Sequence, residues 1–237
     1  MTPFAQRLSN IQDRIDHACR RAGRDPDEVR LMAVSKVHPA AAFAEAVAAG
    51  VTLFGENRVQ EFETKREQLR ELGVQGAEVH LIGHLQSNKS ANAAELFDGI
   101  DSVDSLRVAE RLNETAGKLG KTLPILLEIK LSTEPAKHGL EPDGDDLRSL
   151  FERLPDLKHL DMRGLMTIAP LDENPETARA CFRLLRALQE RWSASFPNLD
   201  FRELSMGMSA DFEIAIEEGS TLVRIGTALF GARPRPR

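Results

Sequence analysis

The sequence predicts an α/β fold, a single-domain (β/α)8 TIM barrel with an extra N-terminal helix. Short apolar runs alternate with stretches of helical periodicity along the chain, and eight such units can be counted. The 237 residues leave little over once eight units are placed. This alternation indicates parallel strands joined by right-handed crossovers. Because periodicity cannot show whether the sheet closes, a doubly wound open sheet is the alternative.

The first half of the chain contains the extra helix and four strand–helix pairs. Helix 3–22 is predicted from apolar residues at helical spacing, namely Phe4, Leu8, Ile11, Ile15, Ala18 and Cys19. The pairs that follow are LMAVS (31–35) with helix 39–49, VTLF (51–54) with 57–72, VHLIG (79–83) with 88–97, and GIDSV (99–103) with 105–119. The last of these helices has one apolar face, formed by Leu106, Ala109, Leu112 and Ala116.

The second half continues the same alternation. Its pairs are LPILLEIKL (123–131) with a helix near 145–153, LDMRGLMTI (160–168) with 175–192, FRELS (201–205) with 209–218, and TLVRIG (221–226) with the short TALFG. Asn174-Pro175 marks one helix start, and Gly219 marks a helix end. No linker or repeat divides the chain, so we predict one domain over residues 1–232. The basic tail RPRPR (233–237) is expected to be disordered.

The composition is that of a soluble globular protein, with 41% hydrophobic and 29% charged residues. The net charge of −6 argues against binding to nucleic acid or to anionic membranes. Cys19 and Cys181 are too few for a disulfide framework, and neither belongs to a Cys/His cluster. The N-terminus lacks the apolar core of a signal peptide, and no uncharged apolar run reaches 18 residues. We therefore predict a cytoplasmic protein without a bound metal.

Polar residues gather where the predicted strands end, which is where a barrel carries its active site. They are Lys36, Glu56-Asn57-Arg58, His84, Gln86, Asn88, Lys89, Asp104, Thr167, Ser205, Ser209, Arg224, Gly226 and Thr227. Lys36 ends an apolar strand, and such a lysine is either a solvated edge charge or a desolvated amine that attacks carbonyls.

The segments after the last two strands resemble a phosphate site. LSMGMSAD (204–211) supplies hydroxyls and a glycine, and RIGTALFG (224–231) supplies Gly226, Thr227 and a short helix start. A glycine lets the backbone approach an anion closely, and the adjacent amides can donate to it. A serine-capped helix and a turn glycine would give the same pattern without a ligand. A lysine across from a phosphate cradle fits a phosphorylated aldehyde such as pyridoxal 5′-phosphate.

At these residues the sequence resembles the pyridoxal phosphate homeostasis protein family over essentially its whole length. The matching motifs are AVSK (33–36), FGENRVQE (54–61), HLIGHLQSNK (80–89), SVDS (102–105), GLMTIAP (164–170) and LSMGMSADFEIAIEEGSTLVRIGTALFG (204–231). The family is similar to the barrel domain of alanine racemase, the fold type III group. The resemblance therefore implies the same barrel and a covalently bound pyridoxal 5′-phosphate.

The resemblance also implies roles for individual residues. Lys36 would hold pyridoxal 5′-phosphate as a Schiff base, and Arg224 would face its pyridine nitrogen. The phosphate would be bound by Ser209, Gly226 and Thr227, with Ser205 as a further contributor. Asn57, His80 and Met166 would line the ring pocket. No residue is predicted to be catalytic.

Each of these residues has a plainer interpretation from the sequence alone. Arg224 could pair with a carboxylate such as Glu203, and His80 could be a satisfied core histidine. Met166 could only pack in the core, and Asn57 could only cap a helix. These alternatives are distinguished by where the structure places the side chains.

The resemblance favours a protein that binds and delivers the cofactor without substantial catalysis in vitamin B6 and amino-acid homeostasis. Racemisation in the related fold needs a lysine and a tyrosine on opposite faces of the substrate, and this chain contains no tyrosine. It also ends six residues after Gly231, without the racemase's second domain. His80, His84 or Lys89 could replace the tyrosine, so a racemase or decarboxylase is the alternative. A cofactor-free lysine aldolase is a third. Pyridoxal-phosphate enzymes in their cofactor-free (apo) form are possible partners. The protein is expected to be a monomer.

Overall fold

The computed structural model describes residues 2–132 and 138–232 of the chain. Its parallel strands form a closed barrel in sequence order, because β1 pairs with both β2 and β8. The strands are β1 (Arg30–Val34), β2 (Leu53–Glu56), β3 (Glu78–Leu81), β4 (Gly99–Val103), β5 (Leu123–Glu128), β6 (Leu160–Met166), β7 (Glu203–Ser205) and β8 (Leu222–Ile225). The predicted TIM barrel is confirmed, and the open-sheet alternative is wrong.

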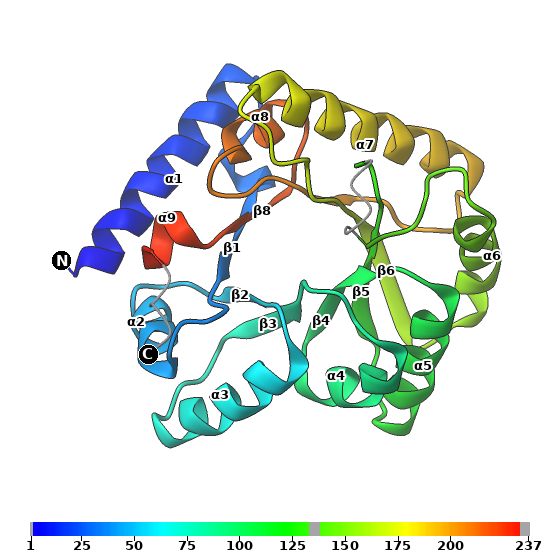
Figure 1. Cartoon of the computed structure of the whole chain (residues 1–237), viewed down its shortest axis with the longest axis horizontal. Helices are drawn as coiled ribbons and strands as arrows, with labels where there is room; N and C mark the ends of the chain where they lie inside the picture. The colour runs from blue at the N-terminus through cyan, green and yellow to red at the C-terminus, as the bar shows by residue number, and fades with distance from the viewer. Residues whose placement is uncertain (1, 133–137, 233–237) are drawn as a thin grey trace.

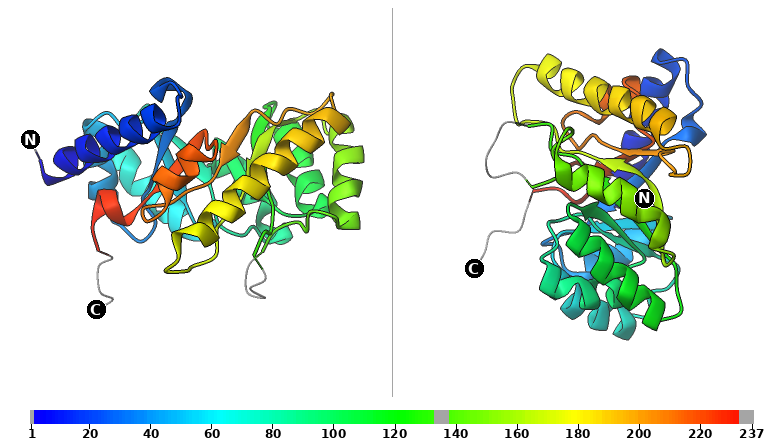
Figure 2. Two further views of the ribbon diagram at one scale, coloured as in Figure 1. Left: turned by 90° about the horizontal axis from the view of Figure 1, so that it is seen from above. Right: turned by 90° about the vertical axis from the view of Figure 1, so that its right-hand side faces the viewer.

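The helices surround the ring of strands, as Figure 1 shows. They are α1 (Pro3–Arg21), α2 (Ala40–Ala48), α3 (Val59–Glu71), α4 (Ser90–Leu96), α5 (Leu106–Lys118), α6 (Asp145–Arg153), α7 (Pro175–Ser195), α8 (Phe212–Glu217) and α9 (Thr227–Phe230). The views in Figure 2 show the same helical layer from two further directions. Within residues 2–132 and 138–232, no helix is long and apolar enough to cross a membrane.

The extra helix α1 begins and packs as its sequence predicts. The Thr2 hydroxyl accepts a hydrogen bond from the Ala5 N–H at 3.2 Å, and Pro3 occupies the first helical position. Its apolar face is buried, and the helix packs against α8 and α9 near the end of the chain. Arg14 and Arg21 add ion pairs to Glu213 and Glu217 on α8. The helix therefore covers the outside of the barrel next to α8 and α9.

The apolar core has two layers. The outer layer lies between strands and helices and contains aromatic pairs such as Phe43 with Phe54, whose rings stack at 3.8 Å. The inner layer takes residues from strands and strand ends only, so its side chains face the inside of the barrel; its members are Met32, Val34, Leu53, Ile82, Leu126, Met166 and Leu222. Polar side chains fill the rest of the interior, and these form the candidate site.

The bounds of β2 and β5 are among those that differ from the prediction. Strand β2 begins at Leu53 and continues through Glu56, where the prediction placed the strand over 51–54. Glu56 is fully buried because Lys65 and Ser35 satisfy one of its oxygens, which the sequence pattern does not show. Strand β5 ends at Glu128, and beyond it Ile129 forms an isolated bridge with Leu140. The predicted tail at 233–237 lies outside the described residues.

Candidate functional site

Lys36 lies in a strained turn directly after β1. Its side chain is half-buried, and the next residue, Val37, has φ of 62°. A β-branched residue rarely adopts this left-handed conformation, so the surroundings must hold the turn in place. The Val37 N–H donates to the Glu61 carboxylate on α3, which is one such contact.

A buried ion pair supports the same turn from beneath. The Lys65 ammonium on α3 donates to the Ser35 carbonyl at 2.9 Å and to a Glu56 oxygen. The Ser35 hydroxyl donates to the same Glu56 oxygen at 2.7 Å. Burial raises the pKa of Glu56, and the nearby charge of Lys65 only partly opposes that shift. The lysine turn is therefore anchored by a desolvated network from β2 and α3.

Arg224 on β8 points into the barrel and is 4% exposed. Its guanidinium donates to the Ser205 carbonyl at 2.7 Å, to the Ser205 hydroxyl at 2.8 Å and to the Thr167 carbonyl at 2.8 Å. Burial lowers its pKa, and the negative charges of Asp101, Glu128 and Asp211 oppose that shift. A guanidinium stays protonated even so, which leaves a permanent positive charge inside the barrel.

The loop that carries Ser209 lies next to the start of α9. Ser209 lies in the loop after β7, and its hydroxyl accepts a hydrogen bond from the Ala228 N–H at 3.3 Å. Ala228 belongs to the short helix α9, which begins immediately after Gly226. Ser205 is instead buried, and its hydroxyl accepts a hydrogen bond from Arg224, so it helps to orient the guanidinium.

His80 occupies a different place from the other predicted residues. It is buried on β3, with Nδ1 bonded to Asp101 at 2.7 Å and Nε2 bonded to Glu78 at 2.8 Å. Burial by itself lowers the pKa of His80, but the charge of Asp101 and the bonds to both carboxylates outweigh it and raise the pKa. Both ring nitrogens are occupied, as in a satisfied core histidine.

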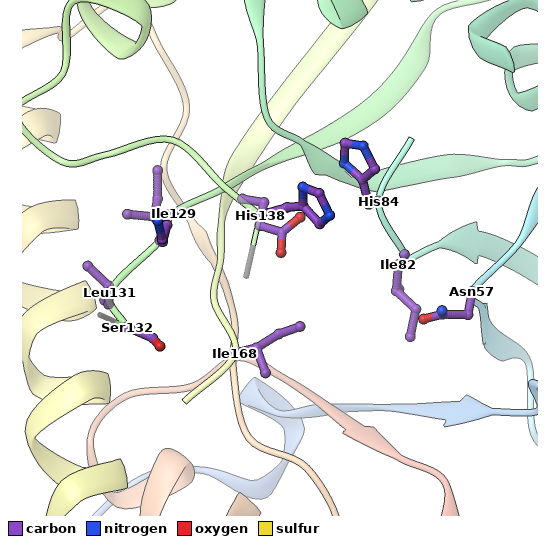
Figure 3. A pocket seen from close by; sticks show the side chains of 11 residues that line it. Asn57, Ile82, His84, Ile129, Leu131, Ser132, His138 and Ile168 are labelled. Carbon is purple, nitrogen blue, oxygen red and sulfur yellow. The ribbon is translucent and has the colours of Figure 1, made fainter. Parts of the chain in front are cut away.

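A cavity of about 250 Å³ opens at the carboxyl ends of β2, β3 and β5, and Figure 3 shows its lining residues. Asn57 lines it next to Gly83, where a Cβ would lie 2.2 Å from the Asn57 carbonyl oxygen. Only glycine allows this close approach. Met166 is buried in the inner layer of the barrel. Of the predicted ring-pocket residues, Asn57 alone lines this cavity.

Strand order explains which predicted residues are neighbours. Because β7, β8 and β1 are adjacent in the closed barrel, Ser205, Arg224 and the Lys36 turn lie side by side. One end of the barrel therefore carries three polar groups. They are the half-buried amine of Lys36, the fixed guanidinium of Arg224 and the hydroxyl of Ser209 beside the start of α9. This donor set fits a small anionic aldehyde, since the amine can attack the carbonyl while hydroxyl and amide groups bind the anion.

The sequence interpretation missed Glu128, a buried carboxylate that lines the cavity. Burial and the charge of Asp104 raise the pKa of Glu128 to about 7, against the opposing charges of Arg224 and His84. The signal was present in LPILLEIKL, because a charged residue inside an otherwise apolar strand faces the barrel interior.

Glu128 should make stability depend on pH in the cofactor-free protein. Its pKa is raised in the folded state, so its contribution to stability is complete below pH 4.5 and is lost as pH rises through about 7. Glu128→Gln stays neutral and avoids this loss. We expect its free energy of unfolding to exceed wild type by on the order of 3 kcal/mol at pH 8, with no such gain at pH 4.5, by denaturant titration. The exposed control Glu141→Gln should show no such trend, and a pH-independent difference for Glu128→Gln would contradict the assignment.

Comparisons with known proteins agree with the observed fold. A family model described as alanine racemase, N-terminal domain, matches residues 7–234. The pyridoxal phosphate homeostasis protein of Escherichia coli (strain K12) is 45% identical to the chain, and the match covers 98% of both. The protein of the same name from Aquifex aeolicus (strain VF5) is 42% identical over 96% of this chain and 97% of its own.

Solved structures extend the comparison to the fold. PipY of Synechococcus elongatus PCC7942, with PLP bound, has a TM-score of 0.84 and 43% identity, covering 96% of this chain and 100% of its own. The alanine racemase of Clostridium difficile 630 has a TM-score of 0.72 at 17% identity, and the match covers 97% of this chain and 57% of the racemase. At that identity the likeness shows a shared barrel alone.

Proposed function

Because the chain belongs to the pyridoxal phosphate homeostasis protein family, we propose that it binds pyridoxal 5′-phosphate and takes part in vitamin B6 and amino-acid homeostasis without substantial catalysis. The family membership rests on relatives that match it along nearly their full length. PipY, a structural relative at 43% identity, binds PLP. Bound pyridoxal phosphate supplies an aldehyde that combines with amines and a ring that accepts electron density.

Lys36 is the residue that we propose would hold the cofactor covalently, because an amine can condense with the aldehyde with loss of water. Its half-buried position at the barrel mouth leaves the amine within reach of a ligand bound there, and an amine is the nucleophile that attacks an aldehyde. The strained turn and the Glu56–Lys65 network fix the backbone from which the side chain extends. Ser209, Gly226 and Thr227 bind the phosphate in this proposal, with hydrogen bonds from the hydroxyls and from backbone amides of α9.

The proposed lack of catalysis rests on the buried position and fixed hydrogen bonds of Arg224. Three hydrogen bonds hold its buried guanidinium beside the strand that leads to Lys36. A group that cannot give up its proton donates a hydrogen bond to a ring nitrogen without protonating it. An unprotonated ring withdraws electrons weakly, which limits carbanion chemistry. Ser205 contributes by orienting Arg224.

Asn57, Met166 and His80 are the residues that would line the ring pocket in this proposal. His80 holds hydrogen bonds to two carboxylates, so it would have to exchange one of them to act as a base. The sequence contains no tyrosine that could protonate the second face of a substrate. The closed barrel leaves no sheet edge to be paired, so we also propose a monomer.

One experiment tests both halves of the proposed function. The protein loaded with cofactor is incubated separately with L- and D-alanine, serine and lysine, and then with an enzyme stripped of pyridoxal 5′-phosphate. We expect no sustained change in enantiomers and no release of carbon dioxide, but recovery of activity in the stripped enzyme. Sustained turnover that Lys36→Ala abolishes would establish an enzyme in place of a carrier. Failure to load the recipient faster than free cofactor does would contradict delivery.

A further inference from the structure

Three metal-ligating side chains meet at the barrel mouth, outside the residues assigned to the cofactor. His84 follows β3, Asp104 follows β4 directly, and His138 lies between β5 and α6. These strands are consecutive neighbours in the barrel, so their carboxyl ends share one edge. One ligand atom from each residue lies within 4.8 Å of the other two.

The contacts within this cluster hold the two imidazoles face to face beside Asp104. Nδ1 of His84 is 2.7 Å from a carboxylate oxygen of Asp104, whose side chain is 10% exposed. The His84 and His138 rings stack at 3.7 Å between centroids, with 9° between their planes. Figure 3 shows these two rings next to each other on one wall of the cavity.

We propose that His84, Asp104 and His138 bind a divalent transition-metal ion of the zinc type. Two imidazoles and one carboxylate are ligands that Zn²⁺ prefers, whereas Mg²⁺ and Ca²⁺ require mainly oxygen ligands. Zinc–ligand bonds of about 2.0–2.2 Å place tetrahedral ligand atoms roughly 3.3 Å apart. In the stacked arrangement the ring nitrogens do not converge, so binding requires the two imidazoles to rotate apart, which their exposed positions outside the core allow.

The surroundings favour a cation with an open coordination position. His84 and His138 both line the cavity of about 250 Å³, so a fourth ligand would approach from that side. Glu128 lines the same cavity and adds a second carboxylate, whereas the Lys130 ammonium, also at the cavity, lies 3.1 Å from Glu141. Three protein ligands with a fourth position facing a cavity is the arrangement of zinc sites that accept a water or a small ligand.

The inference does not depend on the proposed function, since none of the three residues is assigned to the cofactor. It differs from the expectation that no metal binds, which rested on sequence spacing. Asp104 lies 20 residues after His84, and His138 lies 34 residues after Asp104, so the three ligands form no short sequence motif. Asn57 lines the same cavity, and metal and cofactor binding must therefore be measured separately.

The test is a titration of chelator-treated protein with Zn²⁺ in competition with a chromophoric chelator, with and without pyridoxal 5′-phosphate. We expect one Zn²⁺ per chain in both forms of the wild type. His84→Ala and His138→Ala should each weaken binding by at least about 100-fold, since changes to outer-shell partners already cause 10- to 100-fold losses. The matched control His17→Ala changes an exposed histidine on α1 and should bind like wild type. Mg²⁺ should not compete.

Cobalt supplies a second readout that structural damage alone would not reproduce. Co²⁺ at a four-coordinate site gives visible d–d bands, which we expect in wild type and His17→Ala and not in His138→Ala. Without metal, the melting temperatures of wild type, His17→Ala and His138→Ala should be the same, because His17 and His138 are both exposed. Absence of Zn²⁺ binding in wild type, equal binding by the cluster variants, or binding that requires the cofactor would overturn the site.

Discussion

Replacing Lys36 with alanine is expected to abolish covalent attachment of pyridoxal 5′-phosphate while leaving the barrel folded. In wild type, borohydride reduction followed by peptide mass analysis should place the pyridoxyl group on Lys36. The variant should show no labelled peptide, because it lacks the amine that attacks the aldehyde. It should still bind the phosphorylated cofactor reversibly, since Ser209 and the start of α9 are unchanged. The turn lies outside the apolar core, so little stability depends on its side chain.

Other lysines provide the matched controls for this experiment. Lys130 lines the cavity and Lys89 follows β3, so either amine could in principle reach the same ligand. Lys130→Ala and Lys89→Ala should both retain the label on Lys36. A pyridoxyl group on Lys89 or Lys130 in wild type, with Lys36 unmodified, would refute the assignment.

Replacing Arg224 with methionine is expected to destabilise the protein by about 3–5 kcal/mol, because it breaks a fully desolvated charge network. The change leaves the Thr167 and Ser205 acceptors inside the barrel without their donor. It also removes the positive charge that offsets Asp101 and Glu128. Denaturant unfolding at pH 7 measures the loss directly.

A matched control separates this effect from the loss of any arginine. Arg202 is exposed and pairs with Asp200 at the surface, so Arg202→Met should change the free energy of unfolding by less than about 0.5 kcal/mol. Titration gives a second readout, because the charge of Arg224 lowers the pKa of Glu128. That pKa should rise in Arg224→Met. A loss below about 1 kcal/mol with an unchanged Glu128 titration would show that the network is not coupled as described.

The order of elements could be predicted because it depends on local signals. Helix α1 shows its apolar face at helical spacing, and α7 begins at Asn174-Pro175, where the Asn174 side chain accepts from the Glu176 N–H at 3.1 Å. Gly219, which was expected to end α8, has φ of 104°. Each signal involves residues that are neighbours in the chain, so the sequence pattern is enough to detect it.

The part of the candidate site that lies at strand ends could be predicted from the sequence. Lys36, Ser209 and Arg224 follow or occupy strands that the alternation already identified, and a barrel brings such ends together. The family resemblance, and not the strand-end argument, assigned His80 to the ring pocket, and the structure buries it between Asp101 and Glu78. Of its two partners, Asp101 lies on the neighbouring strand β4 and Glu78 lies two residues earlier on β3. Strand periodicity alone could not show whether the His80 ring contacts a ligand or these carboxylates.

By itself the sequence determined the eight strand–helix units, their parallel direction and the residues at their ends. Only the tertiary structure decided that β8 closes onto β1, that Glu56 is buried with Lys65, and that Glu128 is raised in pKa. It alone also brought His84, Asp104 and His138 to one point. The physical reason is that hydrophobic periodicity records local burial, whereas desolvation and charge interactions depend on distances between residues far apart in the chain.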